Sequence, residues 1–268
     1  MLNTKPKNER IEEIKTNGYQ LDFGTVFESA FENYKKIALY AGLMLLVFSI
    51  LSSIVMLTGL VSYIGIEHLE EFGNKMKQLS TLKVMPLEVA LPLNAGLIVF
   101  SAIANPFLAG FLKMADCGEK GEEFHVATMF SYYKSPYFLN IIMAVFSISI
   151  FGTGLAMLLE YSGFGFAGTL TTLLLSFLTF LAIPLIVFGK LSAIDAIKSS
   201  IIIVSKQPLV LLGLTIVAGI GAALGIFGLC IGIFFTWPFI YSMNYVIYKS
   251  IIGIDDETEV QKTANKEI

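Results

Sequence analysis

The residues best suited to chemistry inside the apolar part of this chain are amides and phenols. Asn105 comes directly before Pro106, whereas Tyr241, Asn244 and Tyr245 lie close together near the end of the chain. Lining a cavity, these side chains would bind a lipid headgroup or a small solute. Asn side chains also hydrogen-bond between membrane-spanning helices, and a structural role follows if they do so here. The spacing leaves both roles open.

Residue types that carry catalysis or hold metals are sparse. His68 and His125 fall in different predicted loops, and Cys117, in a charged loop, is far from Cys230. No HExxH or CxxC spacing is present, and neither is a GxSxG or a GxxxxGK[ST] motif. Glu160 is expected in a loop at the outer end of an apolar run. We therefore expect no metal, no cofactor and no enzyme activity.

Glycines recur at helical spacing in the last apolar run. Gly221 and Gly225 are four residues apart, and so are Gly228 and Gly232. Small residues at this spacing let two helix backbones approach closely. Three uses are open, namely packing within the chain, contact with a second copy or a partner protein, and a groove accessible to lipid.

Composition indicates the setting of these residues. The chain has 268 residues, of which 55% are hydrophobic and 15% charged, and its mean hydropathy is +0.74. Soluble domains carry about 25% charged residues. The charged residues leave five uncharged runs at 37–66, 89–112, 135–159, 161–189 and 207–248. This pattern predicts an integral membrane protein.

The runs predict an all-α, polytopic fold with six transmembrane helices. A helix crosses the hydrocarbon core with roughly 20 residues, so the first four runs hold one span each. The last run, as one helix, would be about 63 Å long, so it must fold back, most simply at Gly228–Gly232. The predicted spans are about 38–60, 93–114, 137–159, 167–189, 208–229 and 232–250. A polar N-terminal tail (1–19) precedes this domain (20–250), and a polar C-terminal tail (251–268) follows it.

Basic residues predict the orientation of the spans. Of the 18 Lys and Arg residues, 15 lie in the segment before the first span, in the second and fourth loops, and in the segment from Lys249 onward, all of which six spans place on one side. Lys and Arg concentrate on the cytoplasmic side. Both termini of the multi-pass chain are therefore expected in the cytoplasm.

Three amphipathic segments precede the odd-numbered spans. They are LDFGTVFESAFENYKK (21–36), FHVATMFSYYKSP (124–136) and LSAIDAIKSSIIIVSKQP (191–208). In the first, Phe23, Phe27, Phe31 and Tyr34 share one apolar face, which predicts a helix lying along the membrane surface. The three segments predict three repeats of an in-plane helix and a helical hairpin, arranged either with pseudo-threefold symmetry about the membrane normal or in a line.

Two of these segments carry a resemblance to a known group. LDFGTVFESAFENYKKIA (21–38) and GLCIGIFFTWPFIYSMNYVIYK (228–249) resemble uncharacterised six-span bacterial membrane protein families, related to the membrane domain of glycerophosphodiester phosphodiesterases. The resemblance covers about residues 20–250 and includes no catalytic motif. It implies a six-helix, multi-pass fold in a bacterial cytoplasmic (inner) membrane.

The loop between the first two spans contains a further amphipathic segment. HLEEFGNKMKQLSTLKVM (68–85) keeps Leu69, Phe72, Met76 and Leu79 near one helical face. A helix there would lie on the outer leaflet or cover the end of the bundle, and a role in binding stays open.

These observations favour a non-enzymatic structural, assembly or lipid-associated component of the membrane. A permease or flippase-like transporter of an uncharged or lipidic solute, using the space near Asn105 and Asn244, is the alternative. Expected partners are membrane lipids and either a partner protein or a second copy. Nucleic acid is not expected, because the net charge is −3 and no basic block occurs.

Overall fold

Every regular element in the described part of the chain is a helix. The computed structural model describes residues 7–82, 84–228 and 231–254. The predicted all-α class is therefore confirmed. The elements are α1 (Lys7–Asn17), α2 (Phe23–Ile64), η1 (Ile66–His68), α3 (Leu69–Ser80), α4 (Leu87–Lys120), α5 (Val126–Met129), η2 (Ser131–Lys134), α6 (Phe138–Tyr161), α7 (Gly165–Thr179), α8 (Ala182–Val187), α9 (Ala193–Lys206), α10 (Pro208–Ala223), η3 (Leu224–Phe227), α11 (Gly232–Thr236) and α12 (Pro238–Ile251).

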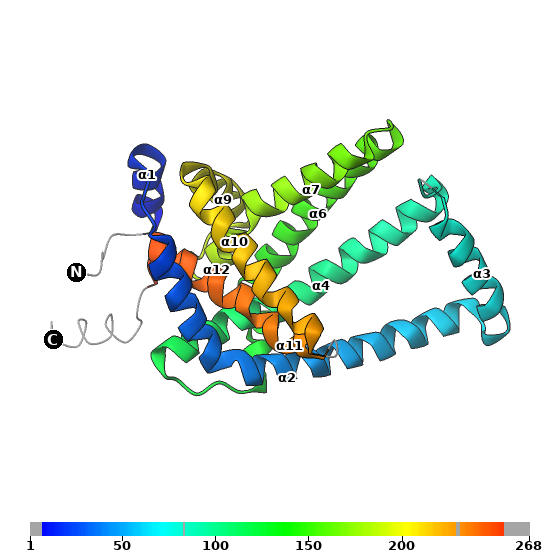
Figure 1. Cartoon of the computed structure of the whole chain (residues 1–268), viewed down its shortest axis with the longest axis horizontal. Helices are drawn as coiled ribbons and strands as arrows, with labels where there is room; N and C mark the ends of the chain where they lie inside the picture. Colours follow the sequence, from blue (N-terminus) through cyan, green and yellow to red (C-terminus); the bar gives the residue numbers. More distant parts are fainter. Residues whose placement is uncertain (1–6, 83, 229–230, 255–268) are drawn as a thin grey trace.

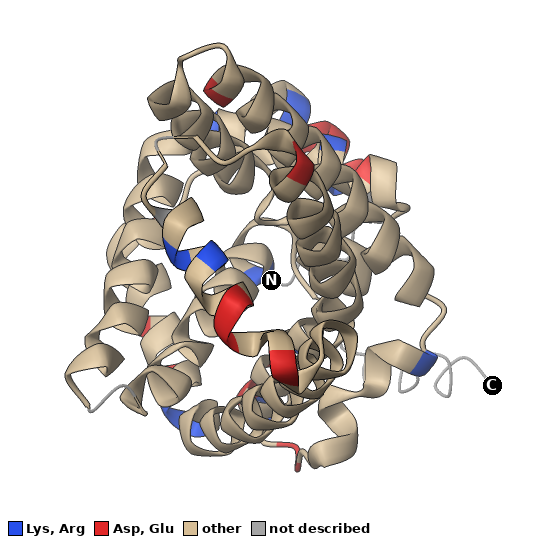
Figure 2. Ribbon diagram, turned by 90° about the vertical axis from the view of Figure 1, so that its right-hand side faces the viewer, with Lys and Arg blue, Asp and Glu red and all other residues tan. Residues whose placement is uncertain are grey.

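Five helical stretches are long and apolar enough to cross a membrane. They are α2, α4, α6, α7 with α8 (Gly165–Val187) and α10 with η3 (Pro208–Phe227). The first five predicted spans overlap these stretches closely. Figure 2 shows that Lys, Arg, Asp and Glu occupy short clusters on an otherwise uncharged ribbon. Uncharged helices of this length are typical of a multi-pass membrane protein.

The sixth predicted span, 232–250, is divided into two shorter helices. α11 ends at Thr236 and α12 begins at Pro238, so one residue, Trp237, separates them. Proline has no amide hydrogen to donate to the preceding turn, which accounts for the break. The chain still follows a nearly helical path there, because the amide of Trp237 donates to the carbonyl oxygen of Ile233 at 2.8 Å.

The predicted surface helix before the first span does not form a separate element. α2 runs without interruption for 42 residues, from Phe23 to Ile64. Its start is capped by Asp22, whose carboxylate accepts from the Thr25 amide at 2.8 Å. The hydrogen bonds from Thr25 hold the pKa of Asp22 below its usual range, which favours the charged form of the cap. No Gly or Pro occurs between Thr25 and Ala41 to end the helix.

The other two surface segments differ from one another. The second contains only α5 and η2, each four residues long. The third is the amphipathic helix α9, whose N-terminal Ser192 hydroxyl accepts from the Asp195 amide at 3.3 Å. The second segment thus forms two short helices, whereas the third forms one continuous helix of 14 residues.

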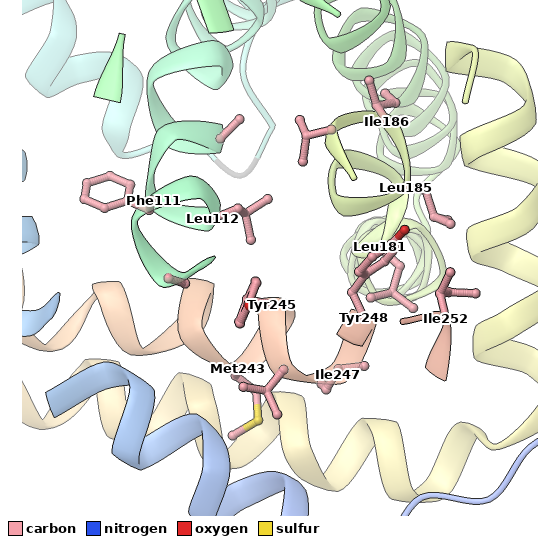
Figure 3. Close-up of a cluster of buried hydrophobic side chains, with 14 of the residues drawn as sticks. Phe111, Leu112, Leu181, Leu185, Ile186, Met243, Tyr245, Ile247, Tyr248 and Ile252 are labelled. Atoms are coloured by element: carbon pink, nitrogen blue, oxygen red, sulfur yellow. The ribbon is translucent and has the colours of Figure 1, made fainter. Parts of the chain in front are cut away.

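Three helices that contain a proline meet in the core. α4 (with Pro106), α8 (with Pro184) and α12 (with Pro238) each contact the other two. Figure 3 shows the apolar side chains of these helices gathered together, including the buried Leu185 and Tyr248. α12 is central, because it also packs against α2 and α10. Two hairpins, α2–α4 closed by α3 and α6–α7, extend from this core (Figure 1).

The predicted polar N-terminal tail is partly folded. Residues 7–17 form α1, which contacts α9 and buries Ile11 and Ile14. The Arg10 Nε donates to the carbonyl oxygen of Ile251 at 3.1 Å, so α1 also contacts the end of α12. In the sequence these two isoleucines stand between polar residues, so the segment does not show an apolar face. Most of the predicted C-terminal tail (251–268) lies outside the described residues.

The helix predicted between the first two spans is confirmed as α3, Leu69–Ser80. Beyond it, the Tyr161 hydroxyl at the end of α6 donates to the carbonyl oxygen of Met85. This contact joins the far ends of the two hairpins. The far ends of both hairpins therefore lie on the same side of the protein, away from the core (Figure 1).

Candidate functional site

An apolar groove lies where α2, α10 and α12 come together. It encloses about 330 Å³. Its lining consists of aromatic, aliphatic and small residues, namely Phe27, Phe31, Tyr34, Val217, Ile220, Gly221, Leu224, Thr236 and Phe239. The first surface segment and the glycine-containing run, which are separate features in the sequence, thus form one site.

Aromatic rings build one wall of the groove. Phe23, Phe27 and Phe31 are four residues apart on α2, and their rings stack with centroid distances of 6.5 and 6.2 Å. Phe239 of α12 meets both Phe27 and Phe31 edge-on at 6.2 Å. Tyr34 contacts the same Phe239 ring at 5.3 Å. Edge-to-face pairs of this kind are favourable beyond the area that they bury, so they fix the shape of the wall.

The absence of a side chain at Gly221 allows the Phe239 ring of this wall to pack against α10. A Cβ at Gly221 would lie 2.8 Å from the Phe239 ring, closer than any side chain tolerates. Gly219, two residues earlier on the same helix, has no neighbour within 4 Å of the corresponding position. The position of Phe239 against α10 therefore depends on the missing side chain at residue 221.

Polar atoms in the groove wall are bonded to the protein itself. The Tyr34 hydroxyl donates to the carbonyl oxygen of Phe235 at 3.1 Å, and the Thr236 hydroxyl donates to that of Ala222 at 2.6 Å. Lys35 lies over the Phe31 ring at 5.5 Å and forms an exposed ion pair with Glu32. The interior of the groove thus offers contacts for an apolar occupant and no charge.

A polar network connects the ends of α4 and α12. The Tyr245 hydroxyl donates to Asp116 Oδ1 at 3.1 Å, and Lys120 Nζ donates to Asp116 Oδ2 at 3.1 Å. Lys249 forms an ion pair with Glu119 one turn further on. Each charge has an opposite partner, so the network is suited to holding the two helices together.

Sequence analysis missed this network because α4 continues to Lys120. Cys117 therefore lies buried on α4 and not in a charged loop. The four-residue spacing of Asp116 and Lys120, typical of a helical ion pair, was the signal that could have revealed the longer helix. Nothing in the sequence pattern indicates that Asp116 meets Tyr245.

The comparisons with family models, curated proteins and solved structures find no match.

The four polar residues predicted to line a cavity lie on two helices. Asn105 donates to the carbonyl oxygen of Ser101, one turn earlier on α4, at 2.9 Å. Tyr241 stacks on Phe111 of α4 with a centroid distance of 5.1 Å, and Asn244 is half-buried on α12. Together with Tyr245, they are absent from the lining of the groove. A solute path through them stays a prediction.

The four predicted packing glycines all approach atoms of their own chain. Besides Gly221 against Phe239, a Cβ at Gly225 would lie 2.5 Å from the carbonyl carbon of Gly232. A Cβ at Gly228 would lie 3.2 Å from the Gly232 Cα. Cys230, between them, lies outside the described residues. A role in oligomer contact stays a prediction.

Metal-binding side chains do not gather in the described part of the chain. No group of three or more His, Cys, Asp or Glu residues there could hold a metal ion. His68 and His125 are both exposed, and their nearest carboxylates are those of Glu71 at 3.7 Å and Glu123 at 4.0 Å.

Proposed function

We propose that this chain is a non-enzymatic, lipid-associated protein of the bacterial cytoplasmic membrane, and that the groove between α2, α10 and α12 binds a lipid acyl chain. The observation that carries the proposal is the lining of the groove. It combines four aromatic rings with aliphatic side chains, and its hydroxyl groups are bonded internally. An acyl chain needs contacts of this kind and no others.

The surroundings of the groove favour lipid over a soluble ligand. Ile220 and Leu224 line it and are 57% and 58% exposed, and the neighbouring Ile216 is 52% exposed. On a helix of membrane-spanning length, such side chains face hydrocarbon. An acyl chain can therefore enter the groove sideways from the bilayer without crossing a polar surface.

The volume of the groove and the apolar lipid around it together determine how selectively the groove can bind an acyl chain. A cavity of 330 Å³ has room for on the order of ten methylene groups, if each takes about the volume of a water molecule, ~30 Å³. Surrounding lipid is as apolar as the groove, so there is no hydrophobic driving force for entry. Binding must come from close packing against the rings, which depends on the shape of the wall.

Photo-crosslinking tests the groove directly. The protein is reconstituted in lipid nanodiscs with a phospholipid that carries a diazirine in its acyl chain, and crosslinked peptides are mapped by mass spectrometry. We expect crosslinks concentrated at the groove residues Phe31, Ile220 and Leu224. Gly221→Leu fills the groove and should lower their yield about fivefold or more, which corresponds to ~1 kcal/mol of lost packing.

Gly219→Leu is the matched control, because residue 219 faces open space on the same helix. It should leave the crosslinking pattern unchanged. Crosslinks spread evenly over all lipid-facing positions, including the 62% exposed Leu173 of α7, would contradict the proposal. Equal yields in the two leucine variants would contradict it as well.

We further propose six crossings, with α11 and α12 together as the sixth and both termini in the cytoplasm. Support comes from the contact between Arg10 and the carbonyl oxygen of Ile251. Residues in contact at the two ends of the membrane domain lie on one side, and this requires an even number of crossings. The mutual contacts of α4, α8 and α12 support the threefold arrangement of repeats.

Cysteine labelling in intact cells checks the orientation. With Cys117 and Cys230 replaced by alanine, a single cysteine is introduced by Glu70→Cys, Thr16→Cys or Ser250→Cys. We expect a membrane-impermeant maleimide to label only the first of these from outside, since α3 belongs to the outer side. A chain with five spans would instead expose Ser250→Cys to the reagent.

A further inference from the structure

A second cavity lies between the last turns of α6 and the first turns of α7. This end of the α6–α7 hairpin is the one farthest from the core (Figure 1). It encloses about 330 Å³ and is lined by Ala156, Glu160, Gly165, Gly168, Thr169 and Thr172. The two helices touch at its base, because a Cβ at Gly168 would lie 2.9 Å from the carbonyl oxygen of Ala156. Glu160 lies in the last turn of α6 and not in the expected loop.

The polar side chains that line this second cavity present hydrogen-bond acceptors. The Thr172 hydroxyl donates its proton to the carbonyl oxygen of Thr169 at 2.8 Å, and the Thr169 hydroxyl donates to that of Gly165 at 3.4 Å. Their oxygen lone pairs stay available to a ligand. Among the described residues, no ion pair or hydrogen bond involves the half-buried carboxylate of Glu160. A cationic donor would complement this set of oxygens.

The flanks of the cavity are apolar. Leu158 on α6 is 63% exposed, and Phe166 and Leu170 on α7 are 78% and 50% exposed. Side chains of this kind on membrane-spanning helices face lipid. A carboxylate next to such a surface is costly unless it is paired. Glu160 directly follows the predicted span 137–159, and a ligand with a positive charge and N–H donors would pair with its carboxylate.

We propose that the cavity binds a primary ammonium group through Glu160, Thr169 and Thr172. Charge-assisted hydrogen bonds from N–H to the carboxylate supply the main attraction, and the hydroxyl oxygens accept the remaining protons. The headgroup of an aminophospholipid and a free primary amine share this chemistry. The inference does not depend on the apolar groove, which is built from other helices.

An experiment on lipid retention tests this site independently of the apolar groove. The protein is placed in nanodiscs that contain equal amounts of ethanolamine and choline phospholipids with identical acyl chains, and native mass spectrometry measures the retained lipid. A choline headgroup has no N–H donor, whereas the groove meets the same chains in both lipids. We expect several-fold preferential retention of the ethanolamine lipid, equivalent to about 1 kcal/mol. Glu160→Gln should remove the preference.

Two further variants make the result specific. Glu88→Gln changes an exposed carboxylate at the start of α4 and should keep the preference. Thr172→Val removes one acceptor while leaving the carboxylate, and should weaken the preference in a folded protein. Folding of each variant is checked by its thermal unfolding midpoint.

A second experiment distinguishes a lipid headgroup from a free amine as the source of the ammonium group. In discs of choline lipid alone, free ethanolamine is added and the unfolding midpoint is measured. A rise in the original protein but not in Glu160→Gln, without lipid preference, assigns the site to a soluble amine. If the protein shows no preference for the ethanolamine lipid and its unfolding midpoint does not rise with free ethanolamine, the proposal is wrong.

Discussion

Replacing Gly110 with alanine is expected to lower the free energy of unfolding by about 1–3 kcal/mol or more. A Cβ at this position on α4 would lie 2.5 Å from the carbonyl oxygen of Met129 and 2.6 Å from its Cα. Both are backbone atoms at the end of α5, so no side-chain rotation relieves the clash. α5 must move away from α4. Thermal unfolding of the purified protein in detergent measures the loss.

Gly96→Ala provides the control on the same helix. A Cβ at residue 96 meets nothing within 4 Å. Alanine also restricts the unfolded chain more than glycine does, so the midpoint should stay unchanged or rise slightly. Equal unfolding midpoints for Gly110→Ala and Gly96→Ala would contradict the close approach of α5 to α4.

The positions of the long helices could be predicted because they depend on local composition. A run of about 20 uncharged residues must form its hydrogen bonds within itself wherever it crosses hydrocarbon. The predicted span 93–114 accordingly lies inside α4, and span 208–229 overlaps α10 and η3. The same reasoning could not define where helices end outside hydrocarbon. There α2 begins 15 residues before its predicted span, and α4 continues six residues beyond.

The candidate site was predictable only in parts. The spacing of Phe27 and Phe31 showed that they share an apolar face, and the small size of Gly221 indicated a close approach. That these residues meet around Phe239 is a consequence of tertiary packing between segments about 200 residues apart, which periodicity within one segment does not contain. The acceptor cavity beside Glu160 was missed for the same reason, since its lining comes from both α6 and α7.

The double substitution Phe27→Glu with Phe31→Glu is expected to abolish acyl-chain crosslinking in the groove. It removes both edge-on contacts with Phe239 and places two carboxylates in an apolar wall. A carboxylate that is buried without a partner in an apolar wall loses its hydration, which is costly. The first part of α2 should therefore separate from α10 and α12, and the unfolding midpoint should fall. Crosslink mapping and thermal unfolding of the same preparation report the two effects.

Two controls distinguish loss of the groove from a general effect of charge. Ser29→Glu adds a carboxylate to the exposed face of the same helix and should preserve both crosslinking and stability. Phe27→Leu with Phe31→Leu keeps the wall apolar but loses its rings, so crosslinking should fall only in part. If the double glutamate variant crosslinked lipid in the groove as efficiently as the original chain, the aromatic wall would have no part in lipid binding. A folded variant that loses only crosslinking would instead show that the wall contributes more to the ligand than to the fold.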